Sequence, residues 1–176
     1  MAKSKTQNNP KEETYYQSIK RRDPAARNNF QIFMLYPGVR ALRWYRVAHF
    51  FYVKCKLKFI GECFSLMARN LTGIEIHPAA FIGKNVFIDH GIGVVIGETT
   101  IVEENVTLFQ GVVLGGRTSS KGLRHPHIKK NVIIGSHAQV LGHITVGEGA
   151  VVGAGAIVLT DVQPETKIHA GEIHRN

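Results

Sequence analysis

Two histidines stand at positions in the sequence where an imidazole could do chemistry. His90 follows Asp89 and precedes Gly91-Ile92-Gly93, which places its ring at a turn with little side-chain crowding beyond it. His125 follows Arg124 in a polar stretch. An imidazole titrates near neutral pH and can therefore act as a general base. From spacing alone, a solvated surface histidine is the commoner outcome at either position.

A repeat of six residues sets the elements that must position these histidines. In the second half of the chain an aliphatic residue recurs at every sixth position, and a small or aliphatic residue follows four places after each. The first set is Ile128, Ile134, Val140, Val146, Val152 and Val158, and the second is Val132, Ala138, Ile144, Ala150, Ala156 and Val162. Neither a helix nor a simple strand has this period. It predicts a parallel β-helix, in which three-sided coils of short strands stack at strand spacing.

The same rule holds earlier in the chain, with one two-residue slip between Ile88 and Ile96. We therefore expect a β-helix over residues 73–169, interrupted by an excursion loop over residues 115–127 that carries Arg124 and His125. Loops on a rigid frame are where binding and catalysis concentrate. A parallel array used only as a scaffold would explain the repeat, but a scaffold does not need this loop.

Residues 13–72 predict a small helical cap that covers one open end of the β-helix. Asp23-Pro24 suits the N-cap and first turn of a helix, which Tyr36-Pro37 should end. The apolar spacing predicts two further helices, from Pro37 to about Val53 and from about Leu57 to Leu71. Residues 1–12 are polar and without periodicity and predict a disordered tail, and residues 170–176 predict a short tail.

The composition narrows the class of partner and compartment. The formal charge of +9 favours polyanions. No recognition motif supports nucleic acid, whereas a phosphate-rich cofactor or a solvated basic surface fits the charge equally well. Cys55 and Cys63 have the spacing of neither a disulfide scaffold nor a zinc site. Because the sequence shows neither a signal peptide nor a membrane span, we expect a reduced, cytoplasmic protein.

A set of motifs makes the sequence resemble the serine acetyltransferases, which belong to the hexapeptide-repeat acyltransferase superfamily. The motifs are Arg22-Asp23-Pro24-Ala25, Gly73-Ile74-Glu75-Ile76-His77-Pro78, Ile88-Asp89-His90-Gly91, Val95-Ile96-Gly97-Glu98-Thr99, Leu114-Gly115-Gly116, Arg124-His125-Pro126 and Val152-Gly153-Ala154-Gly155-Ala156. The resemblance covers residues from about 20 to 165. It implies a mostly β fold, a left-handed parallel β-helix with a helical cap, and a homotrimer with active sites between neighbouring subunits.

The resemblance also implies a reaction and a role for each site residue. Acetyl-CoA would donate its acetyl group directly to the hydroxyl of L-serine, giving O-acetylserine for cysteine biosynthesis. His90 would be the general base, Glu75 its acidic partner, and His125 a further residue of the catalytic centre. Asp23 and Asp89 match residues that hold the ammonium group of the amino acid, and Arg124 matches the residue that holds its carboxylate.

The cofactor contacts implied by the resemblance are Gly116, Ser136 and Ala154, and no metal is expected. The sequence departs from the family pattern in two places. Arg117 and the following Thr-Ser-Ser replace a Thr-Gly pair, and the tail lacks both a long extension and a terminal isoleucine. Docking to O-acetylserine sulfhydrylase is therefore not expected. The cap is shorter than in many relatives, which weakens the case for a hexamer of paired trimers without closing it.

Three alternatives stay open at this point. A relative that acetylates a sugar or another hydroxyl acceptor would use the same base and cofactor machinery. A β-helix carbonic anhydrase would need three histidines on zinc, for which the candidates are His125, His127, His137 and His143. That function would leave Asp89-His90 and Arg124 unexplained. A scaffold that has lost its activity would not need His90 and His125.

Overall fold

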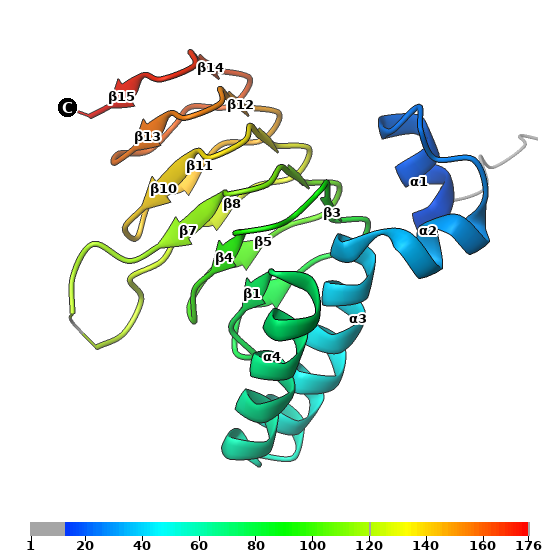
Figure 1. The fold of residues 1–176 in the computed structure, drawn as a ribbon. Coiled ribbons are helices and arrows are strands. Elements are labelled where there is room, and N and C mark those ends of the chain that lie inside the picture. Colours follow the sequence, from blue (N-terminus) through cyan, green and yellow to red (C-terminus); the bar gives the residue numbers. More distant parts are fainter. Residues whose placement is uncertain (1–12, 120, 176) are drawn as a thin grey trace, which may run out of the picture.

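The computed structural model describes residues 13–119 and 121–175, so the predicted disordered tail of residues 1–12 lies outside the described residues. Figure 1 shows a stack of coils running from β1 to β15, with helices packed around the β1 end and a long loop projecting between β7 and β8. The helices are α1 (Tyr15–Arg22), α2 (Asn29–Leu35), α3 (Pro37–His49), the π-helical turn η1 (Phe50–Lys54) and α4 (Lys58–Thr72).

The start of the cap differs from the sequence prediction. A helix was expected to begin at Asp23, but Asp23 follows the end of α1 and its N–H donates to the carbonyl of Ile19 at 2.8 Å. Thr14 and Gln17 form a capping box that begins α1, and the Asn28 side chain caps α2. The prediction of an N-cap at Asp23 is therefore wrong, because its carboxylate bonds to other groups near the site described below.

The later cap helices agree with the apolar spacing. Pro37 is the first residue of α3, where its fixed φ suits a helix and its missing N–H costs nothing. α3 and η1 together reach Lys54, and α4 ends at Gly73, whose φ of +69° is the left-handed conformation that glycine adopts without strain. No helix among the described residues is long and apolar enough to cross a bilayer.

The remaining chain forms the parallel β-helix that the six-residue repeat predicts. Its strands are β1 (Glu75–Ile76), β2 (Phe81–Ile82), β3 (Phe87–Ile88), β4 (Val95–Ile96), β5 (Ile101–Val102), β6 (Thr107–Leu108), β7 (Val113–Gly115), β8 (His127–Ile128), β9 (Ile133–Ile134), β10 (Gln139–Leu141), β11 (Thr145–Val146), β12 (Val151–Val152), β13 (Ile157–Val158), β14 (Lys167–Ile168) and β15 (Ile173–His174). They form three sheets. Sheet A is β1-β4-β7-β10-β13-β15, sheet B is β2-β5-β8-β11, and sheet C is β3-β6-β9-β12-β14.

The interior of the prism consists of the aliphatic residues of the repeat. Every sixth residue from Ile128 to Val158 is completely or almost completely buried, and the small residues four places on follow, with Ile144 only partly buried. Two side chains of each repeat, an aliphatic one and a second that is mostly small, thus fill each side of a coil, and burying the larger one contributes roughly 1.5–3 kcal/mol. A short tail was predicted over residues 170–176, but Ile173 pairs with Ile157 and extends sheet A by one strand.

The first coil is longer than the regular coils, and the extra length lies at His90. Ile76 pairs with Ile96, a spacing of twenty residues, whereas Ile96 pairs with Leu114 and Val140 with Val158, a spacing of eighteen. The slip seen in the sequence is therefore a two-residue enlargement of the turn between β3 and β4. This turn is therefore two residues longer than the other turns from sheet C to sheet A.

The cap packs closely against the same turn. A Cβ on Gly38, near the start of α3, would lie 2.1 Å from the carbonyl oxygen of Ile88, so only glycine permits this approach. Farther along α3, the Tyr45 hydroxyl donates to the carbonyl of Ala80 at 2.6 Å. These contacts fix the cap on the first coil beside Asp89 and His90.

Candidate active site

His90 lies at the enlarged turn that leads from sheet C to sheet A. Its backbone is left-handed, with φ +56°, and its side chain is 74% exposed. Its Nε2 lies 4.0 Å from Oδ1 of Asp89. Gly91 follows with φ +79°, and a Cβ there would lie 2.4 Å from Ile74. Two successive left-handed residues turn the chain sharply and present the imidazole outward, beside the carboxylate that precedes it.

A pocket of about 350 Å³ opens in front of this turn, between it and the cap. Its lining includes Asp23, Tyr36, Pro37, Asp89 and His90. The structure thus brings together Asp23, Asp89 and His90, three of the residues singled out in the sequence. The two carboxylates give the pocket the charge that an ammonium group requires.

The Asp23 carboxylate is held in place by two donors. Oδ1 accepts from the backbone N–H of Ala25 at 2.8 Å, and Oδ2 accepts a short hydrogen bond from the hydroxyl of Tyr36. Burial, together with this bond to Asp23, raises the pKa of Tyr36 to about 12. The phenol therefore stays protonated as a donor at neutral pH and orients the carboxylate toward the pocket.

His125 has a buried environment at the opposite edge of sheet A. It is 8% exposed, and its Nδ1 accepts from the backbone N–H of Thr99 at 3.2 Å. Because Nδ1 accepts, the ring proton of the neutral imidazole is on Nε2. Burial and the adjacent Arg124 lower the pKa of His125, so it is a neutral donor through Nε2. A Cβ on Gly97 would lie 2.1 Å from that nitrogen, so the ring occupies space that a side chain there would fill.

Thr99 organises this second edge. Its hydroxyl accepts from the backbone N–H groups of Arg124 and His125, at 3.1 and 3.2 Å, and contacts Nδ1 of His125 at 2.9 Å. The Arg124 guanidinium forms an ion pair with Glu98 at 3.0 Å. A pocket of about 410 Å³ under the excursion loop includes Arg117, Arg124 and His143 in its lining. This edge is therefore cationic at Arg124 and rigid at His125.

Glu75 lies on β1, between the two edges. Its carboxylate forms an ion pair with Arg69 of α4 at 3.0 Å, in a hollow that also includes Ser65 and His77. Burial lowers the pKa of His77, whose Nδ1 accepts from the N–H of Ala79. Within the described part of one chain, no hydrogen bond or ion pair joins Glu75 to His90. The predicted pairing of these two residues stays a prediction.

The three predicted cofactor contacts divide between the edges. Ser136 and Ala154 lie in the turns from sheet C to sheet A, on the coils above His90, and Gly155 N–H donates to the carbonyl of Ser136 at 2.8 Å. Gly116 lies at the other edge, where a Cβ would be 3.3 Å from the carbonyl of Arg124. Each strand of sheet A enters from the first edge and leaves at the second. The width of the sheet therefore separates the two groups in one chain.

Three of the four histidines considered for zinc have separate partners. His125 bonds to Thr99, His127 pairs with Glu103 at 2.8 Å, and His137 packs against Gly111. Across residues 13–119 and 121–175, no group of three or more His, Cys, Asp or Glu side chains could hold a metal ion.

The sequences of known proteins match this chain over most of the length of the chain. The family model for the bacterial transferase hexapeptide (six repeats) matches residues 125–160. The serine acetyltransferase of Helicobacter pylori strain 26695 is 51% identical over 140 residues, which are 80% of this chain and 81% of that protein. The enzyme of Bacillus subtilis is 54% identical over 140 residues, 80% of this chain and 64% of that protein.

The chain belongs to the serine acetyltransferase family. It is accordingly an acyltransferase, and the resemblance noted in its motifs is confirmed. The crystal structure of Neisseria gonorrhoeae serine acetyltransferase superposes with a TM-score of 0.84 at 34% identity, over 86% of this chain and 58% of that one. These matches confirm the predicted left-handed parallel β-helix with an N-terminal helical region. The chain spans about three fifths of the length of that solved chain.

Several residues that organise the two edges of sheet A were not assigned a role from the sequence. Tyr36 was considered only as the end of a helix, and Glu98 and Thr99 only as parts of a motif. A polar residue at a turn gives no sign of which distant backbone it will bond. The one available signal was Gly97-Glu98-Thr99 at a corner, where a glycine next to polar residues marks a close approach.

Proposed function

We propose that the chain transfers the acetyl group of acetyl-CoA to the hydroxyl of L-serine at a site built by two subunits of a homotrimer. The observation that carries this proposal is the separation of charge across sheet A. The pocket at His90 carries the carboxylates of Asp23 and Asp89, and the opposite edge carries the guanidinium of Arg124. An amino-acid zwitterion requires both charges within a few ångströms of each other, and one chain holds them a sheet apart.

A neighbouring subunit resolves this separation. In a threefold ring, the His90 edge of one prism faces the Arg124 edge of the next, because heterologous contacts join two different surfaces. The serine ammonium group would then lie between Asp23 and Asp89 and its carboxylate against Arg124, with the neutral Nε2–H of His125 as a further donor. Glu98 pairs with Arg124 in the free chain and leaves part of the guanidinium fork available.

His90 is the group best placed to take the serine proton. The hydroxyl of serine is too weak an acid to attack a thioester unaided. As the serine oxygen bonds to the thioester carbonyl carbon, its proton passes to the His90 imidazole. The tetrahedral intermediate then breaks its carbon–sulfur bond, and the departing thiolate takes the proton back. The products are O-acetylserine and CoA. Glu75 would stabilise the imidazolium if the assembled trimer brings its carboxylate to His90.

The row of small residues above His90 suits the cofactor. Ser136 and Ala154 stack along the same edge as the base, and acetyl-CoA bound along this row would present its thioester at His90. Gly116 of the facing edge would complete the channel. The acetate of O-acetylserine is a good leaving group for a sulfur nucleophile, which fits a role in cysteine biosynthesis.

An acceptor screen tests the assignment directly. Purified protein is mixed with acetyl-CoA and one acceptor at a time, and the free thiol of CoA is followed with a thiol-reactive chromophore. We expect release with L-serine, and much less with D-serine, with serine methyl ester, which lacks the carboxylate for Arg124, or with sugars. Release with a sugar and none with serine would overturn the acceptor and leave only the acetyltransferase class.

A further inference from the structure

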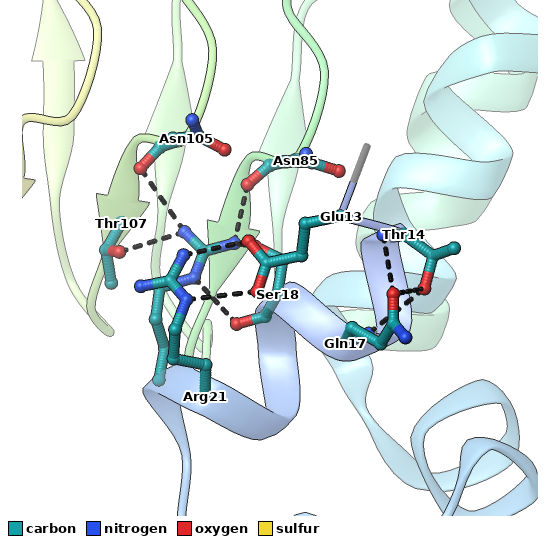
Figure 2. A network of polar contacts seen from close by, with 9 residues as sticks. Glu13, Thr14, Gln17, Ser18, Arg21, Asn85, Asn105 and Thr107 are labelled. Carbon is teal, nitrogen blue, oxygen red and sulfur yellow. Dashed lines mark hydrogen bonds and ion pairs between the residues drawn. The ribbon is translucent and has the colours of Figure 1, made fainter. Parts of the chain in front are cut away.

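The Arg22 side chain makes several hydrogen bonds between the cap and the β-helix, and the acetyl-transfer scheme gives it no role. Its Nη1 donates to the carbonyl of Asn105 at 3.3 Å and to the hydroxyl of Thr107 at 3.1 Å, and its Nη2 donates to the carbonyl of Asn85 at 2.6 Å. The same guanidinium bonds back to its own helix through the carbonyl and hydroxyl of Ser18 (Figure 2).

These bonds join one side chain to two successive coils. Asn85 and Asn105 occupy equivalent turns, both with left-handed backbones, immediately before the paired strands β3 and β6. Each acceptor is a neutral oxygen, and burial lowers the pKa of Arg22 to about 10, so the side chain remains charged at neutral pH. A planar fork with five N–H groups can reach all these acceptors at once, whereas an ammonium group has three donors from one point.

The Arg22 side chain, called the anchor below, also contacts strand β3, which leads to the turn at His90. The Arg22 guanidinium lies over the ring of Phe87, 5.3 Å from its centre, and Tyr36 packs against that ring at 6.4 Å. Phe87 is buried in β3, which leads directly to Asp89 and His90. Arg22 therefore holds the end of α1 to the same strand that positions the base.

Asp23 is the residue that follows this anchor. Its N–H ends α1, and its carboxylate is fixed by Tyr36 and Ala25 at the mouth of the pocket. We propose that Arg22 is a positioning residue for serine: by joining the end of α1 to two coils, it sets the distance from the Asp23 carboxylate to Asp89 and His90. This inference rests on the proposed function, in which Asp23 receives the serine ammonium group.

The test compares Arg22→Gln with Arg21→Gln. Arg21 lies on the same helix and carries the same charge, and within residues 13–119 and 121–175 its ion pair is with Glu13 on the surface, at 3.0 Å, so it is a matched control. We expect Arg22→Gln to raise the KM for serine about tenfold, the loss of one charge-assisted contact, and to leave the KM for acetyl-CoA unchanged. Arg22→Lys should give an intermediate value, and Arg21→Gln should behave as the parent protein.

A double-mutant cycle separates positioning from general stability. If Arg22 acts through Asp23, Arg22→Gln should add little to the serine KM of an Asp23→Asn variant. Additive effects, an equal rise in both KM values, or a serine KM unchanged while the melting temperature falls would each overturn the proposal. So would the failure of both Arg22→Gln and Arg22→Lys to fold, since the role would then be structural.

Hydrogen exchange gives a readout that does not depend on activity. In Arg22→Gln the amides of residues 19–26 should exchange faster while β3 and β6 stay protected, and in Arg21→Gln neither should change. Unchanged exchange in Arg22→Gln would contradict the anchor. If the parent protein released no CoA with serine, the proposed function would fail, while this measurement would still decide whether Arg22 holds the Asp23 segment.

Discussion

The two edges of sheet A hold histidines of opposite character. His90 is exposed on an enlarged turn, beside a carboxylate and an open pocket. His125 is buried, and its Nδ1 accepts from a backbone N–H. An exposed imidazole at a pocket can reach a bound substrate, whereas a buried, neutral imidazole with a fixed tautomer is a directed donor. The same residue type therefore suits two tasks, and each environment sets which task it can perform.

The largest effect is expected at the exposed edge. His90→Ala should lower turnover by about two to four orders of magnitude, the range for loss of a general base. The KM for acetyl-CoA should change little, because the edge formed by Ser136 and Ala154 is untouched. Steady-state kinetics of CoA release measures both. Near-normal turnover would remove the distinction between the edges and make His125 the candidate base.

A substitution at the buried edge, which carries His125, should change the KM for serine more than it changes turnover. His125→Ala removes a single donor and should lower kcat/KM for serine by roughly ten- to a hundredfold, mainly through KM. A substitution that lowered kcat alone would contradict the role of a substrate donor.

Mixing the two variants tests whether the edges meet between subunits. When His90→Ala and His125→Ala chains are refolded together, about a quarter of the sites in random trimers would combine two intact edges, so kcat/KM for serine should rise above the value of either variant alone. Light scattering must show a trimer for this reading. Mixed trimers without recovered activity would place both histidines of a working site in one chain.

A substitution of Glu75 should lower turnover less than the substitution of His90 does. Glu75→Gln keeps the size of the side chain and its hydrogen bonding but removes the charge that would support a protonated His90, so turnover should fall about tenfold, less than for His90→Ala. Glu62→Gln, in the same hollow on α4, is the control and should have no effect. An equal loss in both variants would assign Glu75 to the ion pair with Arg69 alone.

The smallest effect concerns stability in acid. Burial places the pKa of folded His125 below its ordinary value of 6.5, so as pH falls through that value the unfolded chain binds a proton that the folded chain does not. The free energy of unfolding should therefore decrease as pH falls below about 6.5. His125→Asn keeps an acceptor for the Thr99 N–H but cannot titrate, and its denaturant midpoint should fall less between pH 7.5 and 5.5. Parallel curves would contradict this account.

The repeat determined the β-helix because each coil is a local unit. An aliphatic residue at every sixth position can be buried only by stacking, so the period by itself specifies the sides, the corners and the core from Ile128 to Val158. The slip between Ile88 and Ile96 likewise marked the enlarged turn at His90. Motif resemblance supplied the family. All of these depend on residues close together in the chain.

The cap and the partners of the site were decided only by tertiary structure. Asp23 has the residue type of an N-cap, but its backbone N–H ends α1 instead. Its carboxylate accepts from the hydroxyl of Tyr36, which lies thirteen residues farther along the chain. Thr99 contacts His125 across 26 positions, because two coils bring their corners together. A sequence pattern records which groups must be buried, but it does not record which distant carbonyl or hydroxyl a polar side chain will bond. That choice depends on packing, because a partly buried donor or acceptor bonds to whichever group the fold places within reach.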